Sequence, residues 1–256
     1  MEYQAIQSEK VPSLGLGTWR LSGEECVWAV ERALVLGYRH VDTAQMYANE
    51  GEVGRSIRNS SVDREEIFLV TKVRTSSFSH HNVLRSTRES LKKLQTEYVD
   101  LLLMHWPNPS VPLGETLGAM RELQEEGSVK HVGVSNFPPS MVEEATEHAE
   151  IFCNQVEYHP YRMQDELLGQ AREMDYLLTA YSPVAKGRIL NDATLREIGQ
   201  VYDKTPAQVT LRWLIQQEKV VAIPKAASED HLRSNFEVFD FELSNEEMER
   251  VFELRR

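Results

Sequence analysis

Short apolar runs alternate with longer amphipathic segments along the whole 256-residue chain. The apolar runs show no polar alternation, which is typical of strands buried on both faces of a parallel sheet. The segments between them have the pattern of helices that pack one face against such a sheet. The pattern predicts strands at 13–19, 39–43, 67–73, 99–106, 129–135, 152–158, 177–182 and 220–224. It predicts helices at 22–36, 49–59, 81–95, 113–126, 139–150, 165–174, 192–202, 205–217, 229–237 and 245–254.

Eight strand–helix units spaced about thirty residues apart indicate a (β/α)₈ TIM barrel. Residues 1–12 precede the first unit and are expected to form a small β-hairpin that turns near Ser8-Glu9-Lys10. The last segment is a short C-terminal helix that begins after Ser244. No linker or low-complexity stretch divides the sequence, so a single domain over residues 1–256 is predicted.

A doubly wound open sheet is the competing fold. Such a sheet usually carries a three-glycine phosphate fingerprint after its first strand. Here the corresponding stretch, Gly15-Leu16-Gly17-Thr18-Trp19-Arg20, has only the first two glycines. We therefore interpret Gly15 and Gly17 as places where the first strand packs closely at the barrel wall.

Charge and cysteine content narrow the classes of partner. Forty acidic residues face 28 Lys and Arg, for a net charge of −12, which argues against nucleic acid or an anionic membrane as a partner. Cys26 and Cys153 fit no metal or redox motif and are expected to be reduced. The first ten residues lack an apolar signal core, and no run approaches the roughly 18 apolar residues of a membrane helix. A cytoplasmic protein is predicted.

Three chemically active side chains end successive predicted strands. Asp42, Lys72 and His105 are separated by 30 and 33 residues, which is one strand–helix unit each. In a (β/α)₈ barrel the C-terminal strand ends meet at the face that carries the chemistry. The three side chains should therefore lie side by side, with Tyr47 above them on the loop that follows Asp42.

This group of residues is suited to proton transfer. A lysine within an apolar strand needs a charged partner, and Asp42 on the neighbouring strand provides one. The pair has a purely structural interpretation as well, as an ion pair at the barrel rim. A nearby Lys72 ammonium is expected to lower the pKa of the Tyr47 phenol and make its proton usable. His105 would then orient a carbonyl oxygen or help to relay the proton, unless it is simply a core histidine.

The group supplies a proton but no electrons, so carbonyl reduction would need a hydride from a cofactor. Candidate cofactor residues lie in the second half of the chain, with side chains able to hydrogen-bond an amide, to stack on a flat ring or to bind phosphate. Basic residues near the seventh and eighth loops are where barrels bind phosphate. These candidates are Ser135, Asn136, Gln155, Tyr181, Ser182, Lys225, His231, Arg233 and Asn235.

Eight stretches spread along the chain are characteristic of one family: LGLGTWR, GYRHVDTAQMYANEGEVGRSI, LVTKV, VDLLLMHWP, GVSNF, NQVEYHP, YSPVAKG and IPKAASEDHLRSNFEVFDFELS. Through them the sequence resembles the aldo-keto reductase family along essentially its whole length. The resemblance implies a (β/α)₈ barrel whose base is closed by a hairpin, and NADPH-dependent reduction of aldehydes and ketones. It is strongest toward compact prokaryotic members such as the 2,5-diketo-D-gluconate and methylglyoxal reductases.

The resemblance also implies roles for individual residues. Tyr47 would be the general acid, with Lys72 paired to Asp42 to tune it and His105 to position the carbonyl. Ser135, Asn136 and Gln155 would hold the nicotinamide amide, Tyr181 would stack on the ring, and Thr18, Trp19 and Ser182 would complete the cofactor contacts. Lys225 would meet the 2′-phosphate, with His231 and Arg233 nearby and Asn235 at the adenine. The substrate pocket would be lined by Trp19, Tyr47, His105 and Trp106.

The phosphate-binding stretch departs from the family pattern. The family often has a serine after the lysine, then an arginine, then glutamate-asparagine, whereas this chain has Ala226, His231 and Ser234-Asn235. NADPH is still expected because Lys225 remains, with NADH as the alternative cofactor. The sequence stops at Arg256, without the long C-terminal loop of larger members, which predicts an open pocket that accepts varied small carbonyl compounds.

Two other functions fit parts of the pattern. A non-catalytic barrel that binds the cofactor as a regulatory subunit is one, although the intact catalytic group argues against it. A metal-dependent hydrolase with His105, His159 and Asp42 as ligands is the other. The histidine spacing does not fit a metal site, so no metal is expected. A monomer is expected.

Overall fold

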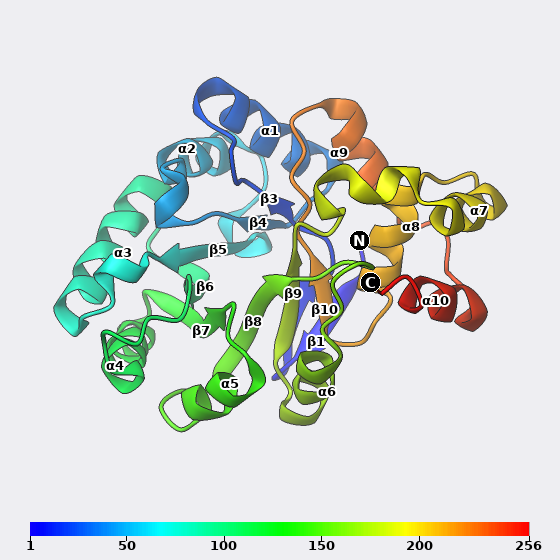
Figure 1. The fold of residues 1–256 in the computed structure, drawn as a ribbon. Helices are drawn as coiled ribbons and strands as arrows, with labels where there is room; N and C mark the ends of the chain where they lie inside the picture. The colour runs from blue at the N-terminus through cyan, green and yellow to red at the C-terminus, as the bar shows by residue number, and fades with distance from the viewer. Residues whose placement is uncertain (256) are drawn as a thin grey trace.

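The computed structural model describes residues 1–255 and contains eight parallel strands surrounded by helices (Figure 1). The strands lie in chain order around the sheet: β3 (Leu16–Gly17), β4 (His40–Asp42), β5 (Phe68–Val73), β6 (Val99–Met104), β7 (Val129–Ser135), β8 (Ile151–Glu157), β9 (Leu177–Tyr181) and β10 (Val220–Ala222). Leu14 forms a parallel bridge with Ala222, which closes the sheet. The (β/α)₈ barrel is therefore confirmed, and the doubly wound open sheet is wrong.

Helices follow the strands and cover the outside of the barrel. They are α1 (Gly23–Leu36), α2 (Glu50–Asn59), α3 (His80–Leu94), α4 (Leu113–Glu125), α5 (Pro139–Thr146), α6 (Asp165–Met174), α7 (Ala193–Tyr202), α8 (Pro206–Ile215), α9 (Glu229–Phe236) and α10 (Asn245–Phe252). Four 3₁₀ turns are η1 (Gln45–Tyr47), η2 (Arg64–Glu66), η3 (Thr75–Ser77) and η4 (Ala185–Asn191). Within residues 1–255, no helix is both long enough and apolar enough to span a membrane.

The barrel has an apolar layer at its base. Side chains alternate between the two faces of a strand, so β5 sends Leu69 and Val73 toward the helices and Val70 into the barrel. The N-terminal hairpin adds Ile6 and Val11 to this inner layer. The remaining members are Leu101, Leu103, Phe152, Cys153, Leu177 and Val221. The hairpin thus closes the barrel interior at its base.

The hairpin turns slightly earlier than the sequence pattern predicts. Its strands are β1 (Tyr3–Ile6) and β2 (Glu9–Pro12), so the turn lies at Gln7–Ser8 rather than near Ser8-Glu9-Lys10. Gln7 and Ser8 both have left-handed backbone, with φ of 45° and 72°. A two-residue turn with positive φ at both positions matches the twist of a hairpin. The residues that usually form such a turn are Asn-Gly or Asp-Gly, and this chain has Gln7-Ser8 there instead.

The first barrel strand is shorter than predicted. Only Leu16–Gly17 of the expected 13–19 strand pairs as a ladder, because the chain bends at Thr18, whose carbonyl accepts from the Leu21 amide. The close packing predicted for Gly17 is present, since a Cβ there would lie 2.7 Å from the Ile223 carbonyl oxygen. The helix expected at 139–150 ends at Thr146 and continues as turns.

The two cysteines are free and buried. Burial raises the pKa of both Cys26 and Cys153 to about 12. Their thiols are therefore neutral at physiological pH and behave as small core residues.

Candidate active site

Polar side chains replace the apolar ones where the barrel strands reach their C-terminal ends. Lys72 lies two residues after Val70, and His105 lies two residues after Leu103, so each points to the barrel interior above an apolar neighbour. Other strand ends, and the loop that follows β10, contribute polar side chains to the same end of the barrel. They are Asp42, Ser135, Gln155, Tyr181 and Lys225, which line one pocket with His105.

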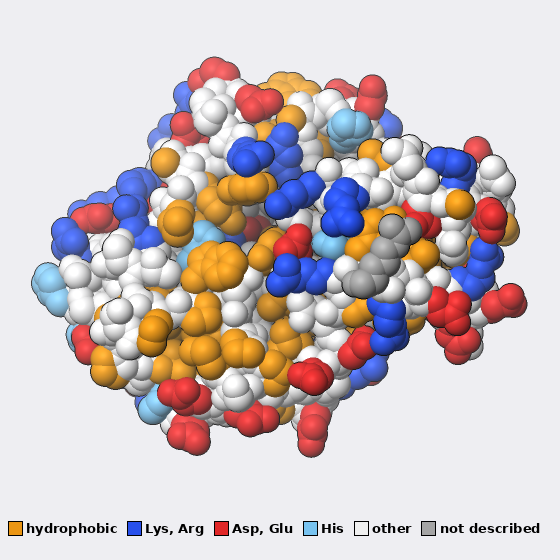
Figure 2. All heavy atoms as spheres, viewed as in Figure 1, with side chains coloured by type: hydrophobic (Ala, Val, Ile, Leu, Met, Phe, Trp, Pro, Cys, Tyr) orange, Lys and Arg blue, Asp and Glu red, His pale blue; other side chains and the backbone are white. Residues whose placement is uncertain are grey.

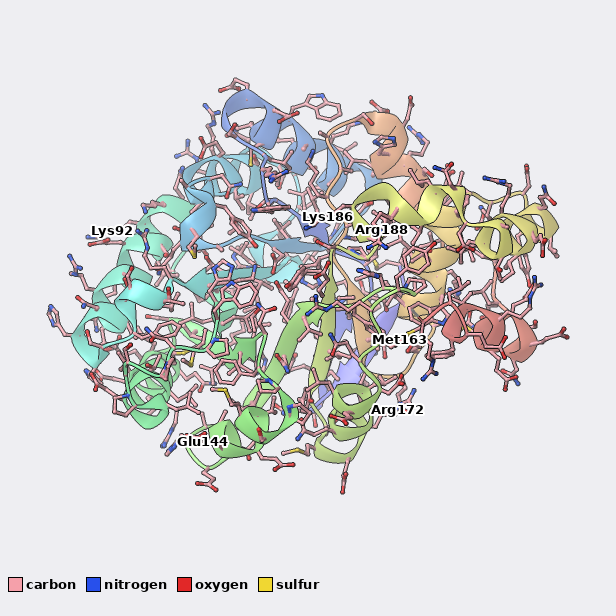
Figure 3. All side chains as sticks on the ribbon, viewed as in Figure 1. Lys92, Glu144, Met163, Arg172, Lys186 and Arg188 are labelled. Atoms are coloured by element: carbon pink, nitrogen blue, oxygen red, sulfur yellow. The ribbon has the colours of Figure 1, made fainter. Side chains whose placement is uncertain are left out.

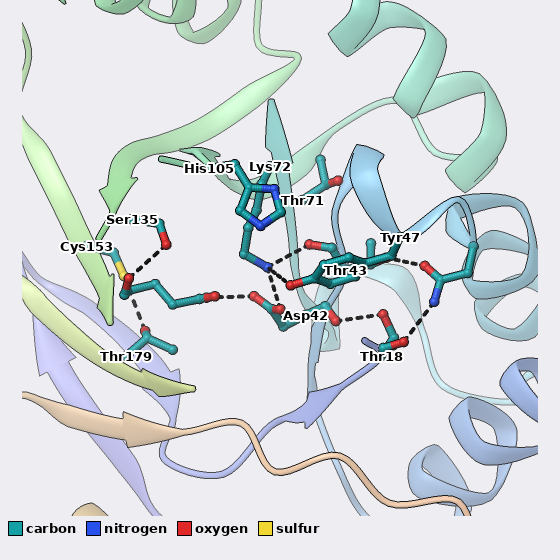
Figure 4. A network of polar contacts seen from close by, with 12 residues as sticks. Thr18, Asp42, Thr43, Tyr47, Thr71, Lys72, His105, Ser135, Cys153 and Thr179 are labelled. Atoms are coloured by element: carbon teal, nitrogen blue, oxygen red, sulfur yellow. Dashed lines mark hydrogen bonds and ion pairs between the residues drawn. The ribbon is translucent and has the colours of Figure 1, made fainter. Parts of the chain in front are cut away.

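Lys72 and Asp42 form a buried ion pair (Figure 4). The Lys72 ammonium lies 2.5 Å from Asp42 Oδ1, donates to the Thr43 carbonyl at 2.9 Å and lies 3.5 Å from the Tyr47 hydroxyl. Burial alone would lower the pKa of Lys72, but Asp42 and Tyr47 outweigh burial, so its pKa lies above the ordinary value. Lys72 is thus a cation at neutral pH, beside the phenol.

The second oxygen of Asp42 is also occupied. The Gln155 amide donates to Asp42 Oδ2 at 2.7 Å across the barrel interior. The Thr18 hydroxyl donates to the backbone carbonyl of Asp42 at 2.9 Å. Thr18 is fully buried, so the structure places it behind Asp42 rather than at the pocket surface. Asp42 is held at three points and has no freedom to turn.

Tyr47 lies on η1, directly above the ion pair. Its ring meets the His105 ring edge-on, with centroids 5.7 Å apart, and lies 5.0 Å from the Lys72 ammonium. Burial raises the pKa of Tyr47 and Lys72 opposes this rise, yet the net pKa stays above the ordinary value. Lys72 thus lowers the pKa of Tyr47 as the sequence predicted, but burial has the larger effect, so the net direction is upward rather than downward.

His105 presents one ring nitrogen to the pocket. Its Nδ1 is enclosed without a hydrogen-bond partner, which leaves Nε2 as the nitrogen that a ligand can reach. Burial, followed by Lys72, lowers the pKa of His105 to about 4. The imidazole is thus neutral at pH 7. A buried unpaired N–H is rarer than a buried unpaired acceptor, so the proton belongs on Nε2, where it can be donated.

These side chains line a pocket of about 490 Å³. Trp19 and Trp106 stand at its mouth, 43% and 47% exposed, so both belong to the pocket wall rather than the core. Besides Gly17 and Ile223, three lining residues were not predicted as part of the site: Met46, Glu157 and Lys186. Glu157 had a usable signal, because it follows Gln155 by two positions on the same strand face. The other two lie on loops, where no periodicity applies.

A chain of hydrogen bonds holds the opposite wall of the pocket. The Tyr181 hydroxyl donates to Asn136 Oδ1 at 2.8 Å. Asn136 donates in turn to Ser135 Oγ at 3.0 Å and to the His105 carbonyl at 3.3 Å, while Ser135 donates to the Gln155 carbonyl at 2.8 Å. Asn136 follows β7 and has a left-handed backbone, with φ of 62°. The Tyr181 ring is therefore fixed at one edge of the pocket.

Cations without carboxylate partners gather over the mouth. Lys and Arg side chains cluster near the middle of this face in Figure 2, in a chain whose net charge is −12. Lys186 and Lys225 both line the pocket, and neither forms an ion pair within residues 1–255. Lys186 lies over the barrel strands in Figure 3 and Arg188 lies farther toward α8, whereas Lys92 lies at the outer edge of the molecule. The mouth is suited to a ligand with several negative charges.

The α9 candidates lie outside the pocket lining. Arg233 is paired with Glu229 at 3.2 Å, and the same carboxylate contacts Arg32. His231 is exposed, and its backbone amide donates to Ser228 Oγ. The Asn235 side chain makes no hydrogen bond within the described chain. Of this stretch only Lys225 faces the pocket directly.

The residues present fit a nicotinamide dinucleotide. Gln155 Oε1 accepts no hydrogen bond from any residue in 1–255, although Gln155 lines the pocket. The fixed Tyr181 ring offers a stacking surface, and the free lysines match phosphate groups. No group of three or more His, Cys, Asp or Glu side chains within residues 1–255 is arranged to hold a metal ion. His159 lies beside Glu157 instead, at 3.5 Å.

Comparisons with known proteins agree with this geometry. The model of the aldo/keto reductase family matches residues 13–256. Methylglyoxal reductase DkgA of Escherichia coli is 37% identical over 95% of this chain and 90% of its own length. Glyoxal reductase of Bacillus subtilis is 38% identical over 96% of this chain and 90% of its own length. The crystal structure of a putative 2,5-diketo-D-gluconic acid reductase B superposes with a TM-score of 0.98 at 46% identity, covering 100% of this chain and 92% of the other.

The chain belongs to the aldo/keto reductase family. The family likeness predicted from the sequence motifs is confirmed, including its direction toward the diketogluconate and methylglyoxal reductases. Nothing in these relatives supports the alternative of a non-catalytic barrel.

Proposed function

We propose that this protein reduces small aldehydes and ketones with NADPH, and that Tyr47 donates the proton. One observation carries the proposal. The Tyr47 hydroxyl lies 3.5 Å from a buried, positively charged lysine and shares a pocket with the neutral imidazole of His105. A phenol, a cation that stabilises its conjugate base and a hydrogen-bond donor for the carbonyl are the groups that protonating a carbonyl oxygen requires.

Each side chain has a distinct part in this scheme. His105 donates from Nε2 to the carbonyl oxygen and holds it near the Tyr47 hydroxyl. Tyr47 releases its proton to that oxygen as negative charge develops there, and Lys72 stabilises the phenolate that remains. Asp42 keeps Lys72 in place and charged. When bound, the reduced nicotinamide supplies the hydride that adds to the carbonyl carbon.

The cofactor roles follow from the same pocket. Tyr181 would stack on the nicotinamide ring, while Ser135, Asn136 and Gln155 would surround its amide. Ser182 lines the pocket beside Tyr181, and Trp19 stands at the mouth near the substrate. Lys225 and Lys186 would meet phosphate groups, and we favour NADPH over NADH because Lys225 is free to bind the 2′-phosphate. Asn235 would approach the adenine from α9, with His231 and Arg233 in lesser roles.

The names of the relatives suggest a substrate class. Reductases of glyoxal, methylglyoxal and 2,5-diketo-D-gluconate act on compounds with more than one carbonyl group. We propose dicarbonyl compounds of this kind as substrates, since the pocket is open at a mouth walled by Trp19 and Trp106. We also propose that the protein acts as a cytoplasmic monomer.

The test is an NADPH-oxidation assay over glyoxal, methylglyoxal, 2,5-diketo-D-gluconate and an aromatic aldehyde, with wild type and Tyr47→Phe. The wild type should oxidise NADPH with at least one dicarbonyl. The variant should lose about 10²–10⁴-fold in kcat, which is the usual size of a general-acid contribution, and should bind NADPH with an unchanged Kd. A Tyr47→Phe variant that kept wild-type kcat would contradict the proton-donor role.

A further inference from the structure

The hydrogen bond between Gln155 and Asp42 joins opposite sides of the barrel. Gln155 lies on β8 and Asp42 on β4, and three strands separate them in the sheet order. The Gln155 amide nitrogen lies 2.7 Å from Asp42 Oδ2, with the two residues 2% and 1% exposed. This bond therefore connects the wall assigned to the cofactor with the group assigned to proton donation.

The chemistry of the two partners fixes the orientation of the Gln155 amide. An ionised carboxylate only accepts hydrogen bonds, so the atom of Gln155 that faces Asp42 must be the nitrogen. Asp42 meets this condition as the carboxylate of an ion pair, with the Lys72 ammonium 2.5 Å from its other oxygen. The Gln155 oxygen must then lie on the other branch of the amide, and it accepts no bond from residues 1–255. Gln155 thus offers the pocket an acceptor.

We propose that Asp42 is a positioning residue for the cofactor site as well as the partner of Lys72. Through Oδ2 it locks Gln155 with the amide oxygen toward the pocket, where the oxygen accepts an N–H from the nicotinamide carboxamide. One carboxylate would thereby set both the proton donor and the recognition of the cofactor amide. This inference rests on the proposed nicotinamide site, and it goes beyond it in assigning the orientation of Gln155 to Asp42.

The inference predicts the effect of Asp42→Asn, which replaces the carboxylate by an amide of the same shape. Lys72 can only donate hydrogen bonds, so the oxygen of the introduced amide would face Lys72. The NH₂ of that amide would then face Gln155. Gln155 would then turn its own oxygen toward this NH₂ and its own NH₂ toward the pocket. The pocket would lose its acceptor although no atom of Gln155 has been removed.

The test compares the Kd of NADPH with that of its 3-acetylpyridine analogue, in which a methyl ketone replaces the carboxamide and no N–H can be donated. Binding is followed by quenching of tryptophan fluorescence, since Trp19 and Trp106 stand at the pocket mouth. The wild type should prefer NADPH by about three- to tenfold, the usual worth of one hydrogen bond. Both Gln155→Met and Asp42→Asn should bring this ratio close to one.

Tyr47→Phe is the matched control. It removes the proton donor from the same pocket but leaves Asp42, Lys72 and Gln155 in place, so the ratio should stay at the wild-type value while reduction is lost. An unchanged ratio in Asp42→Asn would overturn the inference, and so would an unchanged ratio in Gln155→Met. A wild type that bound both cofactors but reduced no carbonyl would instead count against the proposed function alone.

A second measurement needs no folded Asp42 variant and no cofactor. In a ¹H–¹⁵N spectrum of the wild-type protein, the side-chain amide of Gln155 is assigned by its absence in Gln155→Met. One of its two protons should exchange slowly with solvent, because it is buried and bonded to Asp42. Two rapidly exchanging protons would show that the amide is free to turn and would overturn the inference.

Discussion

The ammonium of Lys72 lies 2.5 Å from the carboxylate of Asp42, in a part of the barrel where neither side chain is more than 2% exposed. Removing two charges from water is costly, and the cost is recovered only if both charges remain paired and hydrogen-bonded. Here the Thr43 carbonyl and the Gln155 amide complete the bonding. The stability of the barrel mouth and the chemistry proposed for Tyr47 therefore depend on the same pair.

Lys72→Met should destabilise the protein and impair reduction together. The variant leaves Asp42 buried without a counter-charge, which typically costs about 3–5 kcal/mol of the free energy of unfolding. It also removes the cation that stabilises the Tyr47 phenolate, so kcat should fall about 100-fold or more. Urea unfolding and carbonyl-reduction kinetics measure the two effects. The control Lys92→Met removes an exposed lysine of α3 and should change stability by less than about 0.5 kcal/mol.

His105 should make the protein less stable in mild acid. Its pKa is about 4 in the folded protein and 6.5 in the unfolded chain, so between these values the unfolded state binds more protons. The free energy of unfolding therefore falls as the pH drops from 6.5 toward 4, and below pH 4 this effect levels off. The total loss from His105 is about 3 kcal/mol. Glutamine does not titrate, so His105→Gln lacks this pH dependence. The wild type should therefore lose its advantage in free energy of unfolding over the variant as the pH falls. A gap that stayed constant from pH 7 to pH 4 would contradict the lowered pKa.

Lys225→Met should separate the two nicotinamide cofactors. Only NADPH carries the 2′-phosphate, and a hydrogen bond to a charged group is worth about 1.5–3 kcal/mol, so its Kd should rise about 10- to 100-fold. The Kd of NADH should change by less than about threefold on the same grounds. Arg233→Met is the comparison. It should raise the Kd of NADPH by less than Lys225→Met does, because Arg233 is already paired with Glu229. Equal losses for both cofactors in Lys225→Met would rule out the 2′-phosphate role.

The barrel and the grouping of Asp42, Lys72 and His105 could be predicted from the sequence because both depend on a pattern that repeats with each strand–helix unit. Lys72 stands out within the apolar run FLVTKV, and the spacing from Asp42 to Lys72 to His105 repeats one strand–helix unit. In a barrel whose strands follow one another in chain order, residues at the ends of consecutive strands lie side by side. The structure places these three side chains and Tyr47 together in this way.

Other features depend on relationships that no local pattern contains. Gln155 and Asp42 are 113 residues apart and meet across the barrel, so their bond could not be read from either segment. The raised pKa of Tyr47 is a balance between burial and one cation, and only the full packing decides its sign. The contact of Glu229 with Arg32 likewise joins residues that are 197 positions apart.

The seam that closes the barrel joins two distant parts of the chain. The amide of Gly15 and the carbonyl of Ser13 bond to Ala222, and the amide of Gly17 bonds to Pro224. During synthesis the strand that bears Gly15 and Gly17 is made before its partner, and it has no partner on its outer edge until residues 222–224 have left the ribosome. The barrel therefore cannot close before that point, and its first strand keeps an open edge until then.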